Sequence, residues 1–350
     1  MSPRHTLLSL LFLAPLLLAR PALGFLPYAT TTSTQQQLLQ HARSTSSSGT
    51  THRHRSELSM SSAKLSPADK LRDLINRPEI LIMPCCYDGL TARLVEDNGF
   101  PLTFMTGFGV SGAHGLPDTQ LLSYAEMLAS ATNICSTLKD IPCIGDGDTG
   151  YGNALNVKRT VKGYAQAGMA GIMIEDQIAP KRCGHTKGKS VVGREEAYSR
   201  VRAACDARDE GADILIMART DARAGLGLEE ALERCREFRR IGADITFLEA
   251  PQSEEEMRRY CQQVDGPKLA NMLEFGKTPI LPPVELEKMG YTIAAYPLSL
   301  LSASIKAMNS ALERLKAGEP LDDLLEGFEK VQEVVGFRDY DDTAAKYKID

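Results

Sequence analysis

Short apolar runs alternate with helical stretches eight times between residues 80 and 295, and this alternation constrains the fold more than any other feature. Each run is nearly continuous in apolar residues, as expected for strands buried on both faces of a parallel sheet. The predicted strands are Ile80–Met83, Leu102–Met105, Pro142–Gly145, Gly171–Ile174, Asp213–Met217, Asp244–Leu248, Lys268–Ala270 and Tyr291–Ala295. The predicted helices are Gly89–Asn98, Ser123–Lys139, Ala154–Ala167, Arg194–Glu210, Leu228–Ile241, Ser253–Gln263 and Pro283–Met289.

Several of these helices end in glycine just before the next strand, as a left-handed helix cap requires. The glycines are Gly99, Gly168, Gly211, Gly242 and Gly290. Uninterrupted strand–helix repeats of this number fit a (β/α)8 TIM barrel better than an open doubly wound sheet, and we expect the barrel to occupy residues 61–317. A helix at Leu301–Lys316 and a charged helical tail from Leu321, within residues 318–350, exceed what a barrel needs and are interpreted as oligomer contacts.

The first 60 residues are predicted to be a targeting leader outside the fold. Arg4 precedes an apolar run, Leu7–Ala19, that is too short to span a bilayer and is typical of a signal peptide. A small-residue cleavage site, Ala22-Leu23-Gly24, leaves Phe25 as the new start. From Phe25 to Ser56 the chain is rich in Ser, Thr and Gln and lacks acids, which is transit-peptide composition. We expect a plastid location, with the mitochondrion and the secretory pathway as alternatives.

Composition excludes several classes of partner and site. The eight cysteines show no CxxC spacing, a pattern typical of reduced thiols and unlike a disulfide framework or zinc site. The leader holds five of the 40 basic residues, which leaves a net charge of about −10 and makes nucleic acid an unsuitable partner. No membrane association is expected of the mature form. Beyond the leader only His114 and His185 remain, so any metal must be a hard cation bound by oxygen.

Polar residues follow nearly every predicted strand. In a barrel these strand ends meet at the carboxyl-terminal mouth, where such enzymes build their sites. A polar mouth of this kind would be penalised by desolvation unless it bound something, so we predict a functional site there. The strand-end residues are Cys85 and Cys86, Thr106 and Gly107, Asp146 with Asp148, Glu175, Arg219, Glu249, Asn271, and Tyr296-Pro297.

The residue types at this mouth suggest metal-assisted chemistry on a carboxylate. Asp146, Asp148 and Glu175 suit partly hydrated Mg²⁺ or Mn²⁺, although a glycine-rich turn explains the two aspartates equally well in isolation. Arg219 is a two-pronged donor for a substrate carboxylate, an ion-pair partner of Glu249, or both.

Two further groups are candidates for handling an enolate. Thr106 and the Gly107 amide are candidate donors to a second carboxylate or to an enolate oxygen. Cys183 stands among Lys181, Arg182 and His185, and we expect these neighbours to lower its pKa and to make proton exchange feasible near neutral pH.

These motifs together resemble the isocitrate lyase/phosphoenolpyruvate mutase superfamily. The resemblance covers roughly Lys64 to Leu315 and is carried by motifs that occur in the family's order. It is strongest with the branch of carboxyvinyl-carboxyphosphonate phosphorylmutase-like, methylisocitrate lyase-like and petal death proteins. The motifs are Gly115-Leu-Pro-Asp118, Asp146-Gly-Asp148-Thr-Gly, Glu175-Asp-Gln177, Lys181-Arg-Cys-Gly-His185, Ala218-Arg-Thr-Asp-Ala222, Glu249-Ala-Pro251 and Asn271-Met-Leu-Glu-Phe-Gly-Lys-Thr-Pro279.

The resemblance implies roles for particular residues. It implies Mg²⁺ bound by Asp146, with Asp118, Asp148 and Glu175 acting largely through water, and Cys183 as the general acid on a gating loop. It also implies a homotetramer whose C-terminal helices are swapped between subunits. The remaining expected site residues are Lys181, His185, Arg219 and Glu249 in catalysis, and Thr106, Gly107, Phe108, Arg219 and Asn271 in substrate binding.

Two departures from the family pattern bear on substrate choice. Phe104 stands where methylisocitrate lyases have a tyrosine, and the segment from Val110 to Gly115 is about one residue shorter than in close relatives, which affects Asp118 and His114. We expect a Mg²⁺-dependent lyase that cleaves a malate- or isocitrate-type 2-hydroxy dicarboxylate to a 2-oxo acid and a carboxylate, through an enolate protonated by Cys183. The alternatives are oxaloacetate decarboxylation or hydrolysis, phosphonate chemistry on the same scaffold, and a non-catalytic barrel.

Overall fold

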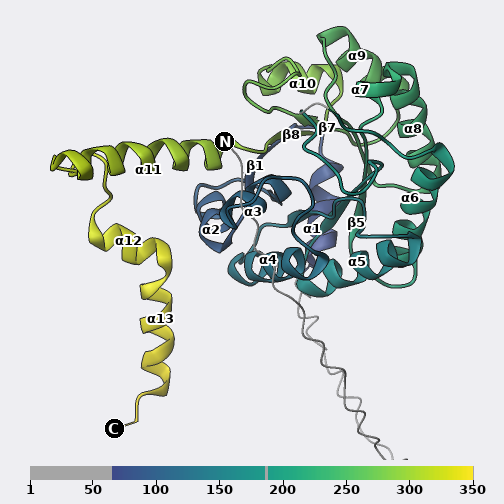
Figure 1. The fold of residues 1–350 in the computed structure, drawn as a ribbon. Coiled ribbons are helices and arrows are strands. Elements are labelled where there is room, and N and C mark those ends of the chain that lie inside the picture. Colours follow the sequence, from purple (N-terminus) through teal and green to yellow (C-terminus); the bar gives the residue numbers. More distant parts are fainter. Residues whose placement is uncertain (1–64, 186–187, 350) are drawn as a thin grey trace, which may run out of the picture. The chain divides into compact units, whose positions relative to one another are not determined.

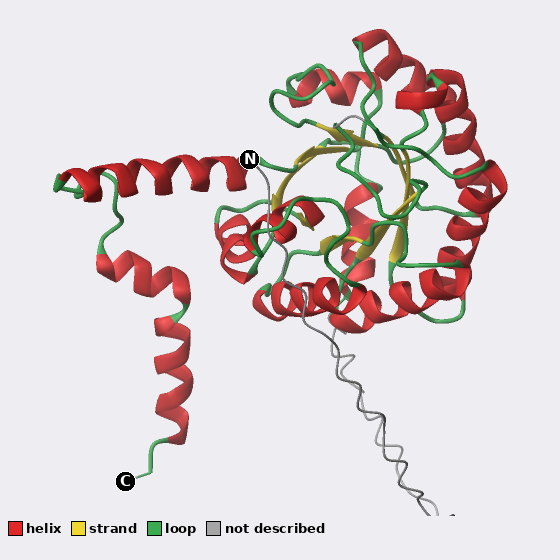
Figure 2. Cartoon of the chain, viewed as in Figure 1, coloured by secondary structure: helices red, strands yellow, loops and turns green. Residues whose placement is uncertain are grey.

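The computed structural model describes residues 65–185 and 188–349. Eight parallel strands form a nearly closed barrel surrounded by helices, which confirms the predicted (β/α)8 class (Figures 1 and 2). The strands are β1 (Leu81–Cys86), β2 (Thr103–Met105), β3 (Cys143–Asp146), β4 (Gly171–Glu175), β5 (Leu215–Thr220), β6 (Ile245–Leu248), β7 (Leu269–Asn271) and β8 (Ile293–Tyr296). The predicted leader, residues 1–60, lies outside the described residues.

The strands pair in the order β6-β5-β4-β3-β2-β1-β8-β7, each parallel to its neighbours. A parallel bridge between Thr246 of β6 and Lys268, just before β7, brings the two edges together, and the Thr246 amide donates to the Pro267 carbonyl at 3.1 Å. All eight carboxyl ends therefore face one side, as the site prediction requires.

The helices between the strands are α2 (Gly89–Asp97), α3 (Gly107–Ala113), α4 (Tyr124–Thr137), α5 (Ala154–Ala167), α6 (Arg194–Asp209), α7 (Arg223–Leu226), α8 (Leu228–Ile241), α9 (Glu254–Gln263) and α10 (Pro283–Met289). The five glycines expected to end helices all adopt positive φ. At Gly168 and Gly290 the backbone is left-handed, and each amide donates back to the helix that it ends. These caps turn each helix directly into the next strand.

One helix closes the amino-terminal end of the barrel. Helix α1 (Pro67–Ile75) begins at Ser66, whose side chain accepts a hydrogen bond from the Asp69 amide. It buries Ala68, Leu71, Leu74 and Ile75 in one cluster with the inward-facing residues of the strands. The contact of Leu71 with the first residue of β4, Gly171, places α1 below the barrel, opposite the predicted site.

The chain continues past the barrel through α11 (Ser299–Ala317), α12 (Phe328–Val335), α13 (Phe337–Ala344) and a short 3₁₀ helix (Ala345–Tyr347). None of these helices contains a buried residue. In the described part of the chain no helix is both long and apolar enough to cross a bilayer. Each of the eight cysteines lies in the described residues, and none forms a disulfide bond.

Candidate active site

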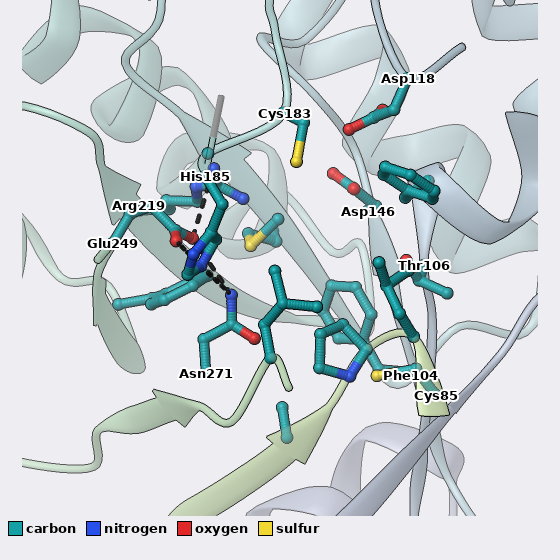
Figure 3. Close-up of a pocket in the computed structure, with 18 of the residues that line it drawn as sticks. Cys85, Phe104, Thr106, Asp118, Asp146, Cys183, His185, Arg219, Glu249 and Asn271 are labelled. Atoms are coloured by element: carbon teal, nitrogen blue, oxygen red, sulfur yellow. Dashed lines mark hydrogen bonds and ion pairs between the residues drawn. The ribbon is translucent and has the colours of Figure 1, made fainter. Parts of the chain in front are cut away.

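A pocket opens at the carboxyl ends of the strands, and all eight strands contribute to its wall (Figure 3). Most of the predicted site residues lie together in it. Those that line the pocket are Thr106, Phe108, Asp118, Asp146, Lys181, Cys183, His185, Arg219, Glu249 and Asn271. Gly107, Asp148 and Glu175 lie behind this lining. His114 ends α3, where its Nδ1 contacts the Val110 carbonyl, and it does not line the pocket.

On one side of the pocket, Lys181 occupies the space between two acids that were expected to serve a metal. Its Nζ lies 2.6 Å from Asp118 Oδ1 and 3.0 Å from Asp148 Oδ1, and all three side chains are buried. Burial raises the pKa of Asp148 to about 6, although Lys181 acts in the opposite direction. Lys181 thus pairs with both aspartates and ties its own loop to the end of β3 and to the connection between α3 and α4.

The Gly107 amide differs from the expectation. It donates to Asp146 Oδ2 at 3.2 Å, so it holds a carboxylate of the protein rather than facing a substrate oxygen. A side chain at this position is impossible without movement, since a Cβ would lie 2.7 Å from the same Oδ2. The Asp148 amide donates to Asp146 Oδ1 at 3.2 Å, which fixes the other carboxylate oxygen.

Glu175 is a buried carboxylate whose negative charge is only partly offset by neighbouring groups. Neither of its oxygens accepts a hydrogen bond from the described residues, although Arg219 Nε lies 3.2 Å from Oε2. Burial raises the pKa of Glu175 well above its ordinary value, and Arg219 offsets only part of that effect. A cation nearby would stabilise the ionised form.

The carboxylates fit a partly hydrated hard cation better than a closed protein cage. Among residues 65–185 and 188–349, no three His, Cys, Asp or Glu side chains converge closely enough to hold a metal ion between them. Asp146 and Glu175 supply only oxygen donors, and magnesium commonly keeps several waters beside one or two carboxylates. Asp118 and Asp148 are paired with Lys181, and Asp118 also lines the pocket.

On the opposite side of the pocket, Arg219 lies among three carboxylates. Nε and Nη2 donate to Asp221, at 2.8 and 3.2 Å, and Nη2 lies 3.4 Å from Glu249 Oε2. The guanidinium carbon also sits 5.1 Å from the centre of the Phe247 ring. The predicted ion pair with Glu249 is therefore present, and Nη1 remains without a hydrogen-bond partner among the described residues.

His185 is held in one orientation by contacts at both ring nitrogens. The Lys277 amide donates to Nδ1 at 3.0 Å, and Nε2 lies 2.8 Å from Glu249 Oε1 (Figure 3). Because Nδ1 accepts a hydrogen bond, the ring proton resides on Nε2 and faces Glu249. Burial opposes ionisation of Glu249, but Arg219 and His185 outweigh it and hold the pKa of Glu249 well below its usual range.

Cys183 stands above the pocket with its sulfur directed inward, between the Asp118–Asp146 side and the His185–Arg219 side (Figure 3). The expectation of a lowered pKa is wrong. Burial raises the pKa of Cys183, and the His185 backbone amide opposes this only in part. Lys181 gives the thiol no counterion because its ammonium group turns to the two aspartates. The thiol is therefore protonated at neutral pH, the state that a proton donor needs.

The inner wall of the pocket is apolar, a feature that the strand-end residues did not reveal. Its side chains are Cys85, Phe104, Met173, Phe247, Leu269 and Ala295. Only Cys85, as a strand-end residue, and Phe104, in place of a tyrosine, were singled out from the sequence. The others point into the barrel from strands that read as uniformly buried, so sequence alone could not separate them from the rest of the core.

Sequence reasoning also missed the residues that hold the Cys183 loop. Gln177 pairs with the Arg182 backbone through both its amide atoms, at 2.8 and 3.1 Å, and Gln120 Oε1 accepts from the Lys181 amide at 3.1 Å. Lys189 reaches Asp221 Oδ1 at 2.7 Å. Gln177 belongs to the Glu175-Asp-Gln177 motif, whereas the only sequence signal of Gln120 and Lys189 is that they lie close to recognised motifs.

A profile of the phosphoenolpyruvate phosphomutase family matches residues 71–316. The chain belongs to this family. Its relatives include 2,3-dimethylmalate lyase of Eubacterium barkeri, 42% identical over 81% of this chain and 96% of the relative. They also include the chloroplastic carboxyvinyl-carboxyphosphonate phosphorylmutase of Arabidopsis thaliana, 39% identical over 78% of this chain and 83% of the relative.

Solved structures agree with this membership in the phosphoenolpyruvate phosphomutase family. Oxaloacetate acetylhydrolase with 3,3-difluorooxalacetate matches at TM-score 0.77 and 36% identity, covering 81% of this chain and 97% of that one. 2,3-Dimethylmalate lyase, described as a PEP mutase/isocitrate lyase superfamily member, matches at TM-score 0.77 and 37% identity, covering 81% and 96%. Phosphonopyruvate hydrolase with oxalate and Mg²⁺ matches at TM-score 0.72 and 26% identity, covering 81% and 99%. The predicted superfamily and the enzyme class, a carbon–carbon lyase within it, are confirmed.

The buried ion pairs of Glu249 predict a pH-dependent stability. Replacing Glu249 by Gln should lower the free energy of unfolding by about 3 kcal/mol at pH 7, because Arg219 and His185 lose a buried partner. Since the folded-state pKa is depressed, this stabilisation is complete above the unfolded pKa of about 4.3 and is lost as pH falls below it. Urea denaturation at pH 7, 5 and 3 should show the same penalty for Glu249→Gln at pH 7 and 5 and a smaller one at pH 3.

Glu255→Gln is the matched control, because Glu255 is exposed in α9. It should change the free energy of unfolding by less than about 0.5 kcal/mol at each pH. A Glu249→Gln penalty that is as large at pH 3 as at pH 7 would contradict the electrostatic explanation.

Proposed function

We propose that this protein is a Mg²⁺-dependent lyase that cleaves an alkyl-substituted, malate-type 2-hydroxy dicarboxylate to a 2-oxo acid and a carboxylate. The observation that carries the proposal is a thiol, Cys183, aimed into a pocket that is ionic on its sides and apolar on its inner wall. The ionic sides suit two carboxylates and a cation. The apolar wall suits alkyl groups that desolvate without cost.

The balance of charges that line the pocket supports a requirement for a divalent cation. Three carboxylates line the pocket, Asp118, Asp146 and Glu249, against two cations, Lys181 and Arg219, that are already paired with acids. A dianionic substrate would add repulsion to this balance. Asp146 would hold Mg²⁺, with Glu175 acting through water. When bound, the ion would polarise the hydroxyl and carboxylate oxygens of the substrate. The related phosphonopyruvate hydrolase structure contains Mg²⁺ and oxalate.

Different residues carry out substrate binding and proton donation in the proposed reaction. Nη1 of Arg219 and the hydroxyl of Thr106 are donors available for substrate carboxylates. Asn271 also lines the pocket, but its Nδ2 lies 3.4 Å from both His185 Nε2 and Glu249 Oε2. As a base accepts the proton of the substrate hydroxyl, the adjacent C–C bond breaks and a carbonyl forms, and the electron pair of that bond passes into an enolate of the second product. Cys183 donates its proton to the enolate carbon. Phe104 has no hydroxyl, so the tyrosine of methylisocitrate lyases has no counterpart in this step.

The apolar wall favours an alkylated malate over the substrates of the alternative reactions. Oxaloacetate hydrolysis or decarboxylation needs the same enolate stabilisation, but oxaloacetate has no alkyl group for Phe104, Met173 and Phe247 to contact. A phosphonate would bring more negative charge to a site whose cations are already paired, and P–C rearrangement uses no thiol proton. The 42% identity with a 2,3-dimethylmalate lyase supports the alkylated substrate.

Replacing Cys183 by Ser tests the proposed acid. The hydroxyl is similar in size but far less acidic, so the rate of cleavage of an alkylated malate with Mg²⁺ should fall about 100- to 10,000-fold. Magnesium affinity, measured by calorimetry, should stay within a few-fold of wild type. Wild-type protein in excess chelator should be inactive. Cleavage by Cys183→Ser at the wild-type rate would exclude the thiol as the proton donor.

We also propose that the chain assembles as a homotetramer with C-terminal helices exchanged between subunits. Helix α11 supports this, since Ile305, Met308, Leu312 and Leu315 recur along one side of it and are 47–62% exposed. An apolar stripe of this size needs cover.

Light scattering of residues 61–350 should therefore give the mass of four chains. Leu312→Glu should shift the distribution to smaller species, whereas Leu155→Glu, at a leucine 73% exposed in α5, should not. A monomer at micromolar concentration would contradict the assembly.

For the leader, we propose delivery to a plastid. The composition of residues 1–60 supports this, and the Arabidopsis relative is named chloroplastic. A reporter fused to residues 1–24 should enter the secretory pathway, and one fused to residues 1–60 should continue to the plastid. Secretion of the longer fusion into the medium would contradict the plastid assignment, and import into mitochondria would replace it.

A further inference from the structure

Lys189 is a buried lysine that the proposed chemistry does not use. Its side chain is 3% exposed, and its ammonium group contacts two acceptors. One is Asp221 Oδ1, at 2.7 Å on a side chain that is fully buried, and the other is the Gly184 carbonyl. An ammonium group is removed from water here although the barrel mouth is nearby, so its placement requires these two acceptors.

The first acceptor, Asp221, belongs to the Arg219 side of the pocket. Its carboxylate accepts from Arg219 Nε and Nη2, and its amide donates to Asp176 Oδ1 at 2.9 Å. Asp176 in turn accepts from the fully buried Arg234 at 2.9 Å. The position of Asp221 is therefore fixed by two buried partners, Arg219 and Asp176, and Lys189 is bound to it.

The second acceptor, the Gly184 carbonyl, lies between Cys183, the proposed proton donor, and His185. Gly184 separates Cys183 from His185, and its backbone lies directly against the Arg219–Glu249 pair. A Cβ at Gly184 would stand 2.5 Å from Arg219 Nη2 and 2.6 Å from the Glu249 carboxyl carbon. Because the peptide is pressed so closely onto that pair, a donor that holds its carbonyl sets the location of the neighbouring thiol.

We propose that Lys189 is a positioning residue that fixes the Cys183–His185 segment over the pocket by joining the Gly184 carbonyl to Asp221. It touches neither substrate nor metal and acts through the backbone of Gly184. The role in turnover rests on the proposed lyase function, whereas the role in holding the segment does not. Two readouts therefore separate the failure of one from the failure of the other.

The first readout is the reactivity of the thiol. In Lys189→Met, which keeps the length of the side chain but removes the donor and its charge, iodoacetamide should alkylate Cys183 about tenfold faster than in wild type. Cys135 and Cys261 are also partly buried and serve as internal controls, and their rates should not change. Peptide mass spectrometry follows all three thiols in one sample.

The second readout is the division between kcat and KM. Displacement of the thiol by about 1 Å should lower kcat for the alkylated malate about 100-fold, while KM stays within about threefold because Arg219 and Asp146 remain in place. If no malate is cleaved by the wild-type protein, the proposed function fails, and the alkylation result still decides the role of Lys189.

Lys268→Met is a matched control variant. Lys268 is also buried and also donates to a backbone carbonyl, that of Gly266 at 2.7 Å, but it lies at the opposite end of β7 from Asn271. This variant should lose stability without changing the alkylation of Cys183.

Two results would overturn the proposal. One is alkylation of Cys183 at the wild-type rate in Lys189→Met, and the other is equal acceleration at Cys183, Cys135 and Cys261, which would show general loosening. If Lys189→Met does not fold, Lys189→Gln, which keeps an amide donor on a shorter stem, must show the same selective increase at Cys183. A wild-type rate in that variant would equally overturn the proposal.

Discussion

The buried charge of Arg219 is the interaction on which this site depends. At the end of β5 it contacts Glu175, Asp221 and Glu249, which follow three neighbouring strands. A guanidinium group in such a place is tolerable only with paired carboxylates, and those carboxylates are tolerable only with the guanidinium. The same arrangement orients His185 through Glu249 and receives the Gly184 backbone against its surface. The segment that bears the thiol therefore rests on this group.

Much of the barrel follows from the sequence because its signals are local. The strands appear as apolar runs and the helix ends as glycines at positive φ, so the order of elements is readable residue by residue. The errors are also local. Helix α3 was missed because Gly107–Ala113 contains three glycines, which are weak helix formers. Helix α1 was missed although Ser66 and Pro67 form a recognisable helix start.

The residues that form the site could be predicted from the sequence, but the way in which their side chains pair could not. Strand ends of a parallel barrel must converge, so Asp146, Arg219 and Glu249 could be placed together without coordinates. Which charges pair could not be foreseen. Burial raises the pKa of the Cys183 thiol, and Lys181, which turns to Asp118 and Asp148, gives the thiol no charge to offset it. Pairings of this kind depend on side-chain direction, which sequence spacing does not encode.

A protonated thiol above a pocket with charged sides and an apolar wall has a direct consequence for the products. The most decisive measurement is NMR of the products formed in D₂O from alkylated malates, isocitrates, oxaloacetate and phosphonopyruvate, each with Mg²⁺. An alkylated malate should give a 2-oxo acid and a carboxylate that carries one deuterium at the carbon released by C–C cleavage, and it should react fastest of the panel. Consumption of phosphonopyruvate with no C–C cleavage of any hydroxy acid would contradict the lyase assignment.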